Sequence, residues 1–251
     1  MAAFKGALRT ALVLLVSWQL LVWLLAPPHY ILPTPLQVLA VFRARFSYLL
    51  DNTLVTLTEI LCGFAAGSLL GIATALCIAA VPRFGRLVWP AVLVLQAFPV
   101  FVIAPLLVLW FGFGMGSKVV MTTLIIFFPV ASAFGDGLRR IEPEILDATS
   151  LTEATRWQEL WHIRVPLAVP SLVSGLRVAA PLAPLGAVIG EWVGASAGLG
   201  FVMVQANARM QTDTVFAAMA IIALLTLVLR RAVDWLGPRL SPWAVEDERL
   251  S

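Results

Sequence analysis

The chain has 251 residues, of which 61% are hydrophobic and 12% are charged. A typical soluble domain is about 45–50% apolar and about 25% charged, so this composition excludes an ordinary soluble domain and predicts a surface that faces lipid. The net charge of +3 does not indicate a nucleic-acid-binding protein, because the basic residues flank apolar segments and form no single patch.

The first apolar run covers residues 8–26 and follows two basic residues, Lys5 and Arg9. A basic segment before an apolar core is also typical of a secretory signal peptide. This run ends in Ala-Pro-Pro without a clear small-x-small cleavage site, and further apolar runs follow it. We therefore expect a retained first helix rather than a cleaved signal.

Apolar runs of about 20 residues predict helices that span a membrane. The chain contains six such runs, at 8–26, 53–81, 87–110, 118–135, 167–192 and 214–236. The second run begins after Asp51 and Asn52, which are residue types that cap helices. The predicted fold class is all-α: a polytopic integral membrane protein with six transmembrane helices in one domain over residues 1–251.

Glycine and proline within the predicted spans indicate two features, close helix packing and kinked helices. Gly63, Gly67 and Gly71 lie four residues apart in the second run, a small-residue spacing that predicts close helix packing. Prolines in the third and fifth runs indicate kinked helices whose freed backbone groups face the bundle: Pro90, Pro99, Pro105, Pro170, Pro181 and Pro184. Such helices suit a lined pathway, although proline is also common in ordinary membrane helices.

Motifs for metal, phosphate or cofactor binding are missing from the sequence. Cys62 and Cys77 both fall in the second run without a metal or disulfide spacing, so we expect two small buried hydrophobic residues. The stretch FGFGMGSK at 111–118 lacks the G-x-x-x-x-G-K-[ST] order of a phosphate loop. We expect a tight outer loop there, no ATP site in this chain and no cofactor.

The positions of lysine and arginine set the predicted orientation. With the N-terminus inside, the inner segments and the inner end of the fifth span hold 13 of the 17 Lys and Arg residues, and the outer segments hold 4. Both termini and the loop at 136–166 are therefore predicted to be cytoplasmic.

The segment 144–166, EILDATSLTEATRWQELWHIRVP, is charged where the surrounding chain is apolar. Pro143 and Glu144 favour a helix start, and Ser150 with Glu153 has the S-x-x-E spacing of a capping box. Two short helices with a turn near 149–152 are predicted. On the second helix, four apolar residues would form one stripe: Trp157, Leu160, Trp161 and Val165.

Two interpretations of this segment stay open from its residues alone. It lies along the membrane surface with its tryptophans at the lipid headgroups, or it docks a cytoplasmic partner. His162 has no Cys, His or acidic partner at a metal-ligand spacing, so no metal site is expected there.

The same segment resembles the cytoplasmic motif of membrane subunits of ATP-binding-cassette (ABC) importers: Glu-Ala-Ala, three residues, Gly, nine residues, Ile-x-Leu-Pro. Asp147-Ala148-Thr149, Glu153 and Ile163-Arg164-Val165-Pro166 have the same spacing. Two stretches, TLVTLTEILCGFAAGSLLGI and IGEWVGASAGLGFVMVQANARMQTD, are similar to nitrate, sulfonate, taurine and bicarbonate permeases, and especially to permeases for hydroxymethylpyrimidine-type thiamine precursors. Glu153 departs from the motif's glycine, a permissive turn residue, and the capping box is predicted to set that turn instead.

This resemblance implies a type I ABC-importer permease fold, in which the loop 142–166 forms coupling helices against a separate ATPase subunit. The implied coupling residues are Asp147, Ala148, Thr149, Glu153, Arg156, Trp157, Ile163 and Pro166. The resemblance also implies a homodimer in the bacterial inner membrane, with a solute-binding protein outside. The implied solute is small and polar: a pyrimidine precursor of thiamine, or alternatively a sulfonate, taurine or nitrate.

Ionisable residues within spans are costly in lipid and are therefore functional candidates. Glu59, Arg177 and Glu191 are candidates for the translocation pathway, with an interface cap at Glu191 and snorkelling at Arg177 as structural alternatives. Three residues of an outer loop are expected to contact the binding protein or solvent: Asn207, Arg209 and Gln211. An intramembrane enzyme with Glu59 and Glu191 as an acid pair, or a plain membrane anchor, are the less favoured alternatives.

Overall fold

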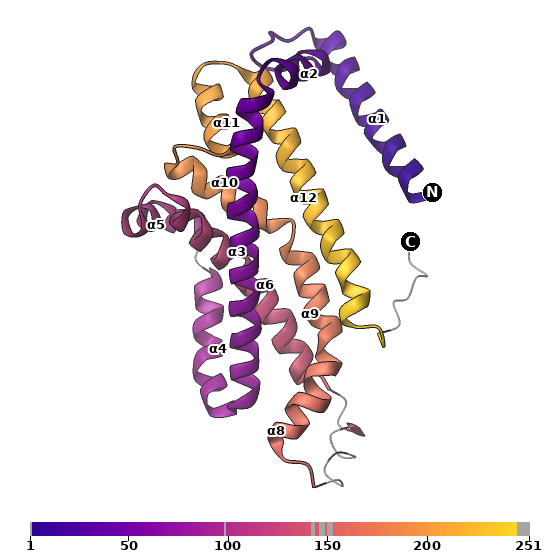
Figure 1. The fold of residues 1–251 in the computed structure, drawn as a ribbon, viewed down its shortest axis with the longest axis vertical. Coiled ribbons are helices and arrows are strands. Elements are labelled where there is room, and N and C mark those ends of the chain that lie inside the picture. The colour runs from indigo at the N-terminus through magenta and orange to yellow at the C-terminus, as the bar shows by residue number, and fades with distance from the viewer. Residues whose placement is uncertain (1, 98, 142–143, 146–148, 150–152, 245–251) are drawn as a thin grey trace.

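The computed structural model describes residues 2–97, 99–141, 144–145, 149 and 153–244, and all regular structure in this part of the chain is helical (Figure 1). This agrees with the predicted all-α class. The helices are α1 (Ala2–Leu25), α2 (Pro35–Ala44), α3 (Phe46–Ala80), α4 (Pro82–Ala97), η1 (Val100–Ile103), α5 (Ala104–Phe111), α6 (Met115–Arg139), α8 (Arg156–Glu159), η2 (Leu160–Arg164), α9 (Val165–Ala179), α10 (Leu182–Gly194), α11 (Leu199–Ala208) and α12 (Thr212–Leu240).

Four helical segments in the described part of the chain are long and apolar enough to cross a membrane: Phe46–Ala80, Met115–Arg139, Arg156–Gly194 and Thr212–Leu240. They contain the second, fourth, fifth and sixth predicted spans. The predicted count of six is not confirmed. The apolar part of α1, Arg9–Leu25, is shorter, and the third predicted span is not one helix.

Proline explains why the run 87–110 does not form a single helix. The chain there divides into α4, the short 3-10 helix η1, and α5. Pro99 caps η1, and Pro105 lies in the first turn of α5. Proline lacks the N–H that continues a helix but fits a first turn, so these two residues begin new segments rather than kink one. Pro90 stays inside α4.

The prediction that a helix begins after Asp51 and Asn52 is wrong, because α3 already begins at Phe46. Asn52 therefore lies within the helix instead of capping it. Its side-chain amide donates to the carbonyl of Tyr48, and its carbonyl oxygen accepts from the N–H of Gly198 at 2.8 Å. Asn52 thus satisfies the chain entering α11 rather than its own helix.

The predicted small-residue interface of the second span is confirmed, and its partner is α6. A Cβ atom on Gly67 would lie 2.7 Å from the Cβ of Ile126 and 2.8 Å from the carbonyl oxygen of Thr123. Gly71 is equally close to the α6 backbone. The two helices therefore pack almost backbone to backbone along the centre of the bundle.

The other face of α3 corrects the prediction for the cysteines. Cys62 and Cys77 are both exposed in this chain rather than buried. α3 buries its glycine face against α6, and Cys62 and Cys77 lie outside that face.

The two ends of the bundle differ (Figure 1). At one end, α2 and α11 cover α3 and α12, with a core that includes Val41, Leu49, Val202 and Ala217. At the other end, α8 and η2 extend α9, and Leu160 packs with Phe134 and Leu138 of α6. We refer to these as the α2 end and the α8 end. The predicted orientation would place the α8 end in the cytoplasm.

Candidate functional site

The predicted coupling segment begins its second helix later than the sequence analysis placed it. Ser150 lies outside the described residues, and α8 begins at Arg156. Its capping box joins Thr155 and Gln158: the N–H of Gln158 donates to the Thr155 hydroxyl at 3.3 Å, and the N–H of Thr155 donates to the Gln158 side chain at 2.9 Å. The predicted Ser150–Glu153 box is therefore not what starts this helix.

Glu153 occupies the motif's glycine position with a left-handed backbone, at φ = +54°. A residue with a side chain is strained there by about 1–2 kcal/mol relative to a right-handed conformation. The turn that the family motif makes with glycine is thus present in this chain, and an exposed glutamate adopts it. Such strain is held where the surrounding structure fixes the turn.

The predicted apolar stripe divides into two faces. Residues 160–164 form a π-helical turn, with the N–H of Val165 bonded to the carbonyl of Leu160. Leu160 is buried in the core at the α8 end, whereas Trp157 is 61% exposed and Trp161 43% exposed. The two indole rings meet edge to face with centroids 5.8 Å apart. A π turn shifts the register of the helix, so Trp157 and Trp161 leave the core that Leu160 enters.

The other predicted coupling residues lie in different settings. Asp147 and Ala148 fall outside the described residues. Thr149 is buried, and its hydroxyl donates to the carbonyl of Ile145 at 2.7 Å. Arg156 is exposed, whereas Ile163 and Pro166 are half-buried at the start of α9. Nearby, the guanidinium of Arg164 pairs with the carboxylate of Glu159 at 2.5 Å. This pair links the last residue of the π turn to the residue just before it.

A buried charge cluster lies toward the α2 end, between α3, α6 and α10. Glu191 is 1% exposed; its Oε1 accepts from the Thr56 hydroxyl at 2.6 Å and its Oε2 from the N–H of Gly200 at 2.5 Å. Glu59 is also buried, and its carboxyl group lies close to that of Glu191.

Lys118 completes this cluster and was missed by the sequence analysis. It was assigned to an outer loop, but α6 begins at Met115 and Lys118 is 1% exposed in the first turn. Its ammonium donates to the carbonyl of Phe113 at 2.6 Å and to that of Gly194 at the end of α10. The Lys118 ammonium thus lies at the C-terminal end of α10, and the Glu191 carboxylate lies at the N-terminal end of α11. Helix dipoles favour a cation and an anion at these respective ends.

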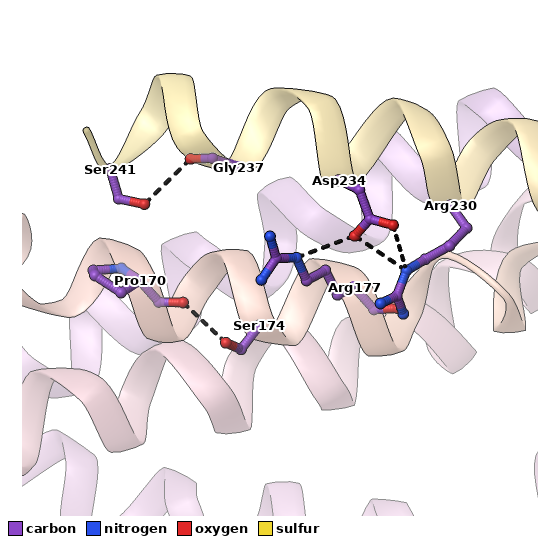
Figure 2. A network of polar contacts seen from close by, with 7 residues as sticks. All are labelled: Pro170, Ser174, Arg177, Arg230, Asp234, Gly237 and Ser241. Carbon is purple, nitrogen blue, oxygen red and sulfur yellow. Dashed lines mark hydrogen bonds and ion pairs between the residues drawn. The ribbon is translucent and has the colours of Figure 1, made fainter. Parts of the chain in front are cut away.

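Arg177 of α9 points toward Asp234 of α12 (Figure 2). Its Nε lies 3.1 Å from Oδ1 of Asp234, and Arg230 contacts Oδ2 of the same carboxylate at 3.1 Å. The Arg230 guanidinium also donates to the backbone carbonyl of Arg177 at 2.7 Å. Gly237 leaves room for this pairing, since a Cβ there would lie 3.2 Å from Nη2 of Arg177.

A cavity of about 1010 Å3 lies beside the middle of α6 and has walls from α3, α4, η1, α9 and α10. Neither Glu59, Arg177 nor Glu191 is among the described residues that line it. Their part in a translocation pathway stays a prediction. At the α2 end, Arg209 and Gln211 line a smaller pocket of about 440 Å3 with Arg45.

Ser196 is a further residue that the sequence analysis passed over. Residues 194–198 read GASAG, which fits the G-x-S-x-G pattern of a nucleophile elbow. That elbow needs a strand before the serine, and here α10 precedes it. The match is therefore one of residue types and not of structure.

A model of the family "Binding-protein-dependent transport system inner membrane component" matches residues 67–242. The chain belongs to this family. It is thus the permease subunit of an ABC importer and not an enzyme, which confirms the resemblance inferred from the sequence.

Two relatives cover nearly all of this permease. A probable ABC transporter permease protein of Haemophilus influenzae is 45% identical over 93% of this chain and 95% of its own length. The formylaminopyrimidine transport permease protein ThiX of Halalkalibacterium halodurans is 35% identical over 92% of this chain and 93% of its own length. Among solved structures, an inward-facing MetNI methionine ABC transporter chain matches with a TM-score of 0.69 and 17% identity, over 78% of this chain and 98% of that chain. This last likeness is one of fold.

Proposed function

We propose that this permease carries a pyrimidine precursor of thiamine inward, within an ATP-driven, binding-protein-dependent importer. The observation that carries the proposal is the 35% identity to a formylaminopyrimidine permease over 92% of this chain. A sulfonate, taurine or nitrate is the second candidate, because the sequence also resembles permeases for those anions. A solute-binding protein delivers the solute at the α2 end, where Arg45, Arg209 and Gln211 line a polar pocket.

The proposed orientation places the α8 end and both termini in the cytoplasm of a bacterial inner-membrane protein. The excess of Lys and Arg in the segments at that end supports it, 13 of 17 residues. In this orientation the loop 142–166 faces a cytoplasmic ATPase subunit. Two copies of the permease form the pathway between them, each bound to one ATPase, because one chain supplies half of a symmetric channel.

The coupling segment is suited to docking by its exposed aromatic pair. Trp157 and Trp161 present their rings beside the exposed side chain of Arg156. Tryptophan and arginine are the residue types that most often dominate protein–protein contacts. The half-buried Ile163 and Pro166 continue from the same turn into α9, so movement of a docked ATPase would reach the membrane helices directly.

Uptake by the complete importer tests the solute. The permease is assembled in liposomes with its ATPase and its binding protein, and uptake of radiolabelled hydroxymethylpyrimidine is compared with uptake of taurine. ATP-dependent pyrimidine uptake is expected. Taurine uptake alone would replace the pyrimidine with the second candidate, and ATP-independent uptake of either solute would overturn the importer mechanism.

Co-purification tests the docking segment. Trp157→Ala is compared with Trp23→Ala, the same change at a similarly exposed tryptophan on α1. Loss of Trp157 is expected to lower ATPase recovery at least ~10-fold, as for a hot-spot contact, while Trp23→Ala retains it. Equal recovery with both variants would favour the alternative in which the segment lies on the membrane surface.

A further inference from the structure

A cavity of about 1010 Å3 lies beside α6, and Glu59, Arg177 and Glu191 are not among the described residues that line it. It lies against the middle of a helix that packs centrally, between α4 and η1 on one side and α9 and α10 on the other. Its volume is that of a site for a small organic molecule, for which about 300–1,000 Å3 is usual.

The walls of the cavity combine aromatic rings with neutral hydroxyl groups. Phe127 and Phe128 of α6 line it together with Ser132, one turn further along the same helix. Thr74 of α3 and Ser174 of α9 add hydroxyls from the neighbouring helices. None of the described lining residues is charged. Residues 91–98 also include no charged residue.

A proline adds a backbone acceptor to this wall. Pro129 lies inside α6 and has no N–H to donate to the carbonyl of Ile125, four residues earlier. Both residues line the cavity. A backbone carbonyl without its helical donor needs another partner at membrane depth, and a cavity-lining position allows a solute or water to supply one.

The nearest cation along the chain is turned away from this space. Ser174 and Val178 of α9 line the cavity, but Arg177 between them pairs with Asp234 on α12 (Figure 2). An anionic solute would therefore meet carbonyl and hydroxyl oxygens with no described cation to balance its charge, which is unfavourable in a low-dielectric site.

We propose that this cavity is a solute-contact site for an uncharged, planar nitrogen heteroaromatic molecule, with Phe127 and Phe128 contacting its ring. The Ile125 carbonyl and the hydroxyl of Ser132 accept hydrogen bonds from its amino or ring N–H groups. The inference rests on the proposed function and adds the solute class and the residues that select it. An anion such as taurine is selected against by the same wall.

Solute selection is measured in liposomes with the complete importer. Phe128→Ala is expected to lower hydroxymethylpyrimidine uptake about 10-fold, the scale of losing one base-stacking ring. Phe128→Tyr, which keeps a ring, restores most of the uptake. Phe46→Ala removes an exposed phenylalanine on α3 and leaves uptake unchanged. Unchanged uptake in Phe128→Ala, or loss that Phe128→Tyr does not restore, would overturn the site.

Protection from labelling locates the solute without relying on transport. Ser132→Cys is introduced into the complete importer with Cys62→Ser and Cys77→Ser, since both natural cysteines are exposed. Hydroxymethylpyrimidine, and not taurine, is expected to slow labelling by a membrane-permeant maleimide. Labelling blocked in the absence of solute would mean that lipid or a second copy fills the cavity and would overturn the proposal. Taurine protection would overturn the solute class, while loss of ATP-dependent uptake of every solute in the unmodified importer would overturn the proposed function itself.

Discussion

The hydroxyl of Thr56 on α3 lies 2.6 Å from a carboxylate oxygen of Glu191 on α10, and the same hydroxyl accepts the N–H of Leu199 at 2.8 Å. One side chain thus connects α3 to the end of α10 and to the start of α11. Asn52, one turn earlier on α3, accepts the N–H of Gly198, so these two side chains together bond the backbone at the start of α11. The hairpin of α10 and α11 is therefore held to α3 by buried polar contacts.

Removing the Thr56 hydroxyl is expected to destabilise the permease. Thr56→Val keeps the shape of the side chain but leaves Glu191 and the N–H of Leu199 short of a partner, at a cost of about 1–3 kcal/mol. Thermal unfolding in detergent measures the change. Thr58→Val is the matched control on the same helix, because Thr58 is exposed and its hydroxyl donates to the carbonyl of Val55 within α3. Equal melting temperatures for the two variants would contradict this role.

Lys118→Met should have a larger effect, because it removes the cation that faces two buried carboxyl groups. Leaving a buried polar group without its partner costs about 1–3 kcal/mol, and more for charged groups. The variant also loses the bonds that join Lys118 to the carbonyls of Phe113 and Gly194. Unfolding in detergent, with ATPase activity of the assembled importer as a second readout, measures the loss.

A double variant separates charge balance from simple loss of packing. Adding Glu191→Gln to Lys118→Met removes the unbalanced charge, so the double variant should lose less stability than the sum of the two single changes. Strictly additive losses would show that Lys118 and Glu191 act independently, against the cluster described here.

The long helices could be predicted from the hydrophobic runs, whereas the contact partners of the charged residues could not. The runs at 53–81, 118–135, 167–192 and 214–236 fall within segments long enough to span, because burial in lipid demands continuous apolar sequence. Glu59, Lys118 and Glu191 lie on three different helices, and spacing along the chain does not say which helices touch. Lys118 also follows Gly116 and Ser117, which are residue types typical of loops, so the sequence did not indicate a position within a helix.

The turn before α8 shows how a local signal can be ambiguous. Ser150 with Glu153 and Thr155 with Gln158 both have the capping-box spacing. A residue at the third position of a helix must be right-handed, and Glu153 is left-handed. The capping-box spacing predicted a turn near 149–152, but backbone handedness at a non-glycine residue leaves no mark in the sequence. Only the family motif, with glycine at this position, indicates the left-handed residue.

The interface of α3 and α6 gives a test of close helix packing. Gly67→Ala places a Cβ within 3 Å of Ile126 and of the carbonyl of Thr123, and such overpacking is expected to cost about 1–3 kcal/mol. Gly6→Ala is the matched change in a helix with nothing within 4 Å of the new Cβ. It should be neutral or slightly stabilising, since alanine favours helix. A Gly67→Ala protein as stable as Gly6→Ala would mean that the two helices are farther apart than described.

Glu153→Gly should stabilise the turn before α8, because glycine adopts φ = +54° without the strain that any side chain incurs there. The gain is expected to be about 1 kcal/mol relative to Glu153→Ala, which removes the charge but keeps the strained backbone. Unfolding in detergent compares the two variants, and ATPase stimulation in the assembled importer reports whether the carboxylate itself contributes to docking. If both Glu153→Gly and Glu153→Ala retain ATPase stimulation, the position contributes through its backbone shape and not through its carboxylate. Coupling lost in both would instead assign it to the charge, and a Glu153→Gly protein less stable than Glu153→Ala would contradict the left-handed turn.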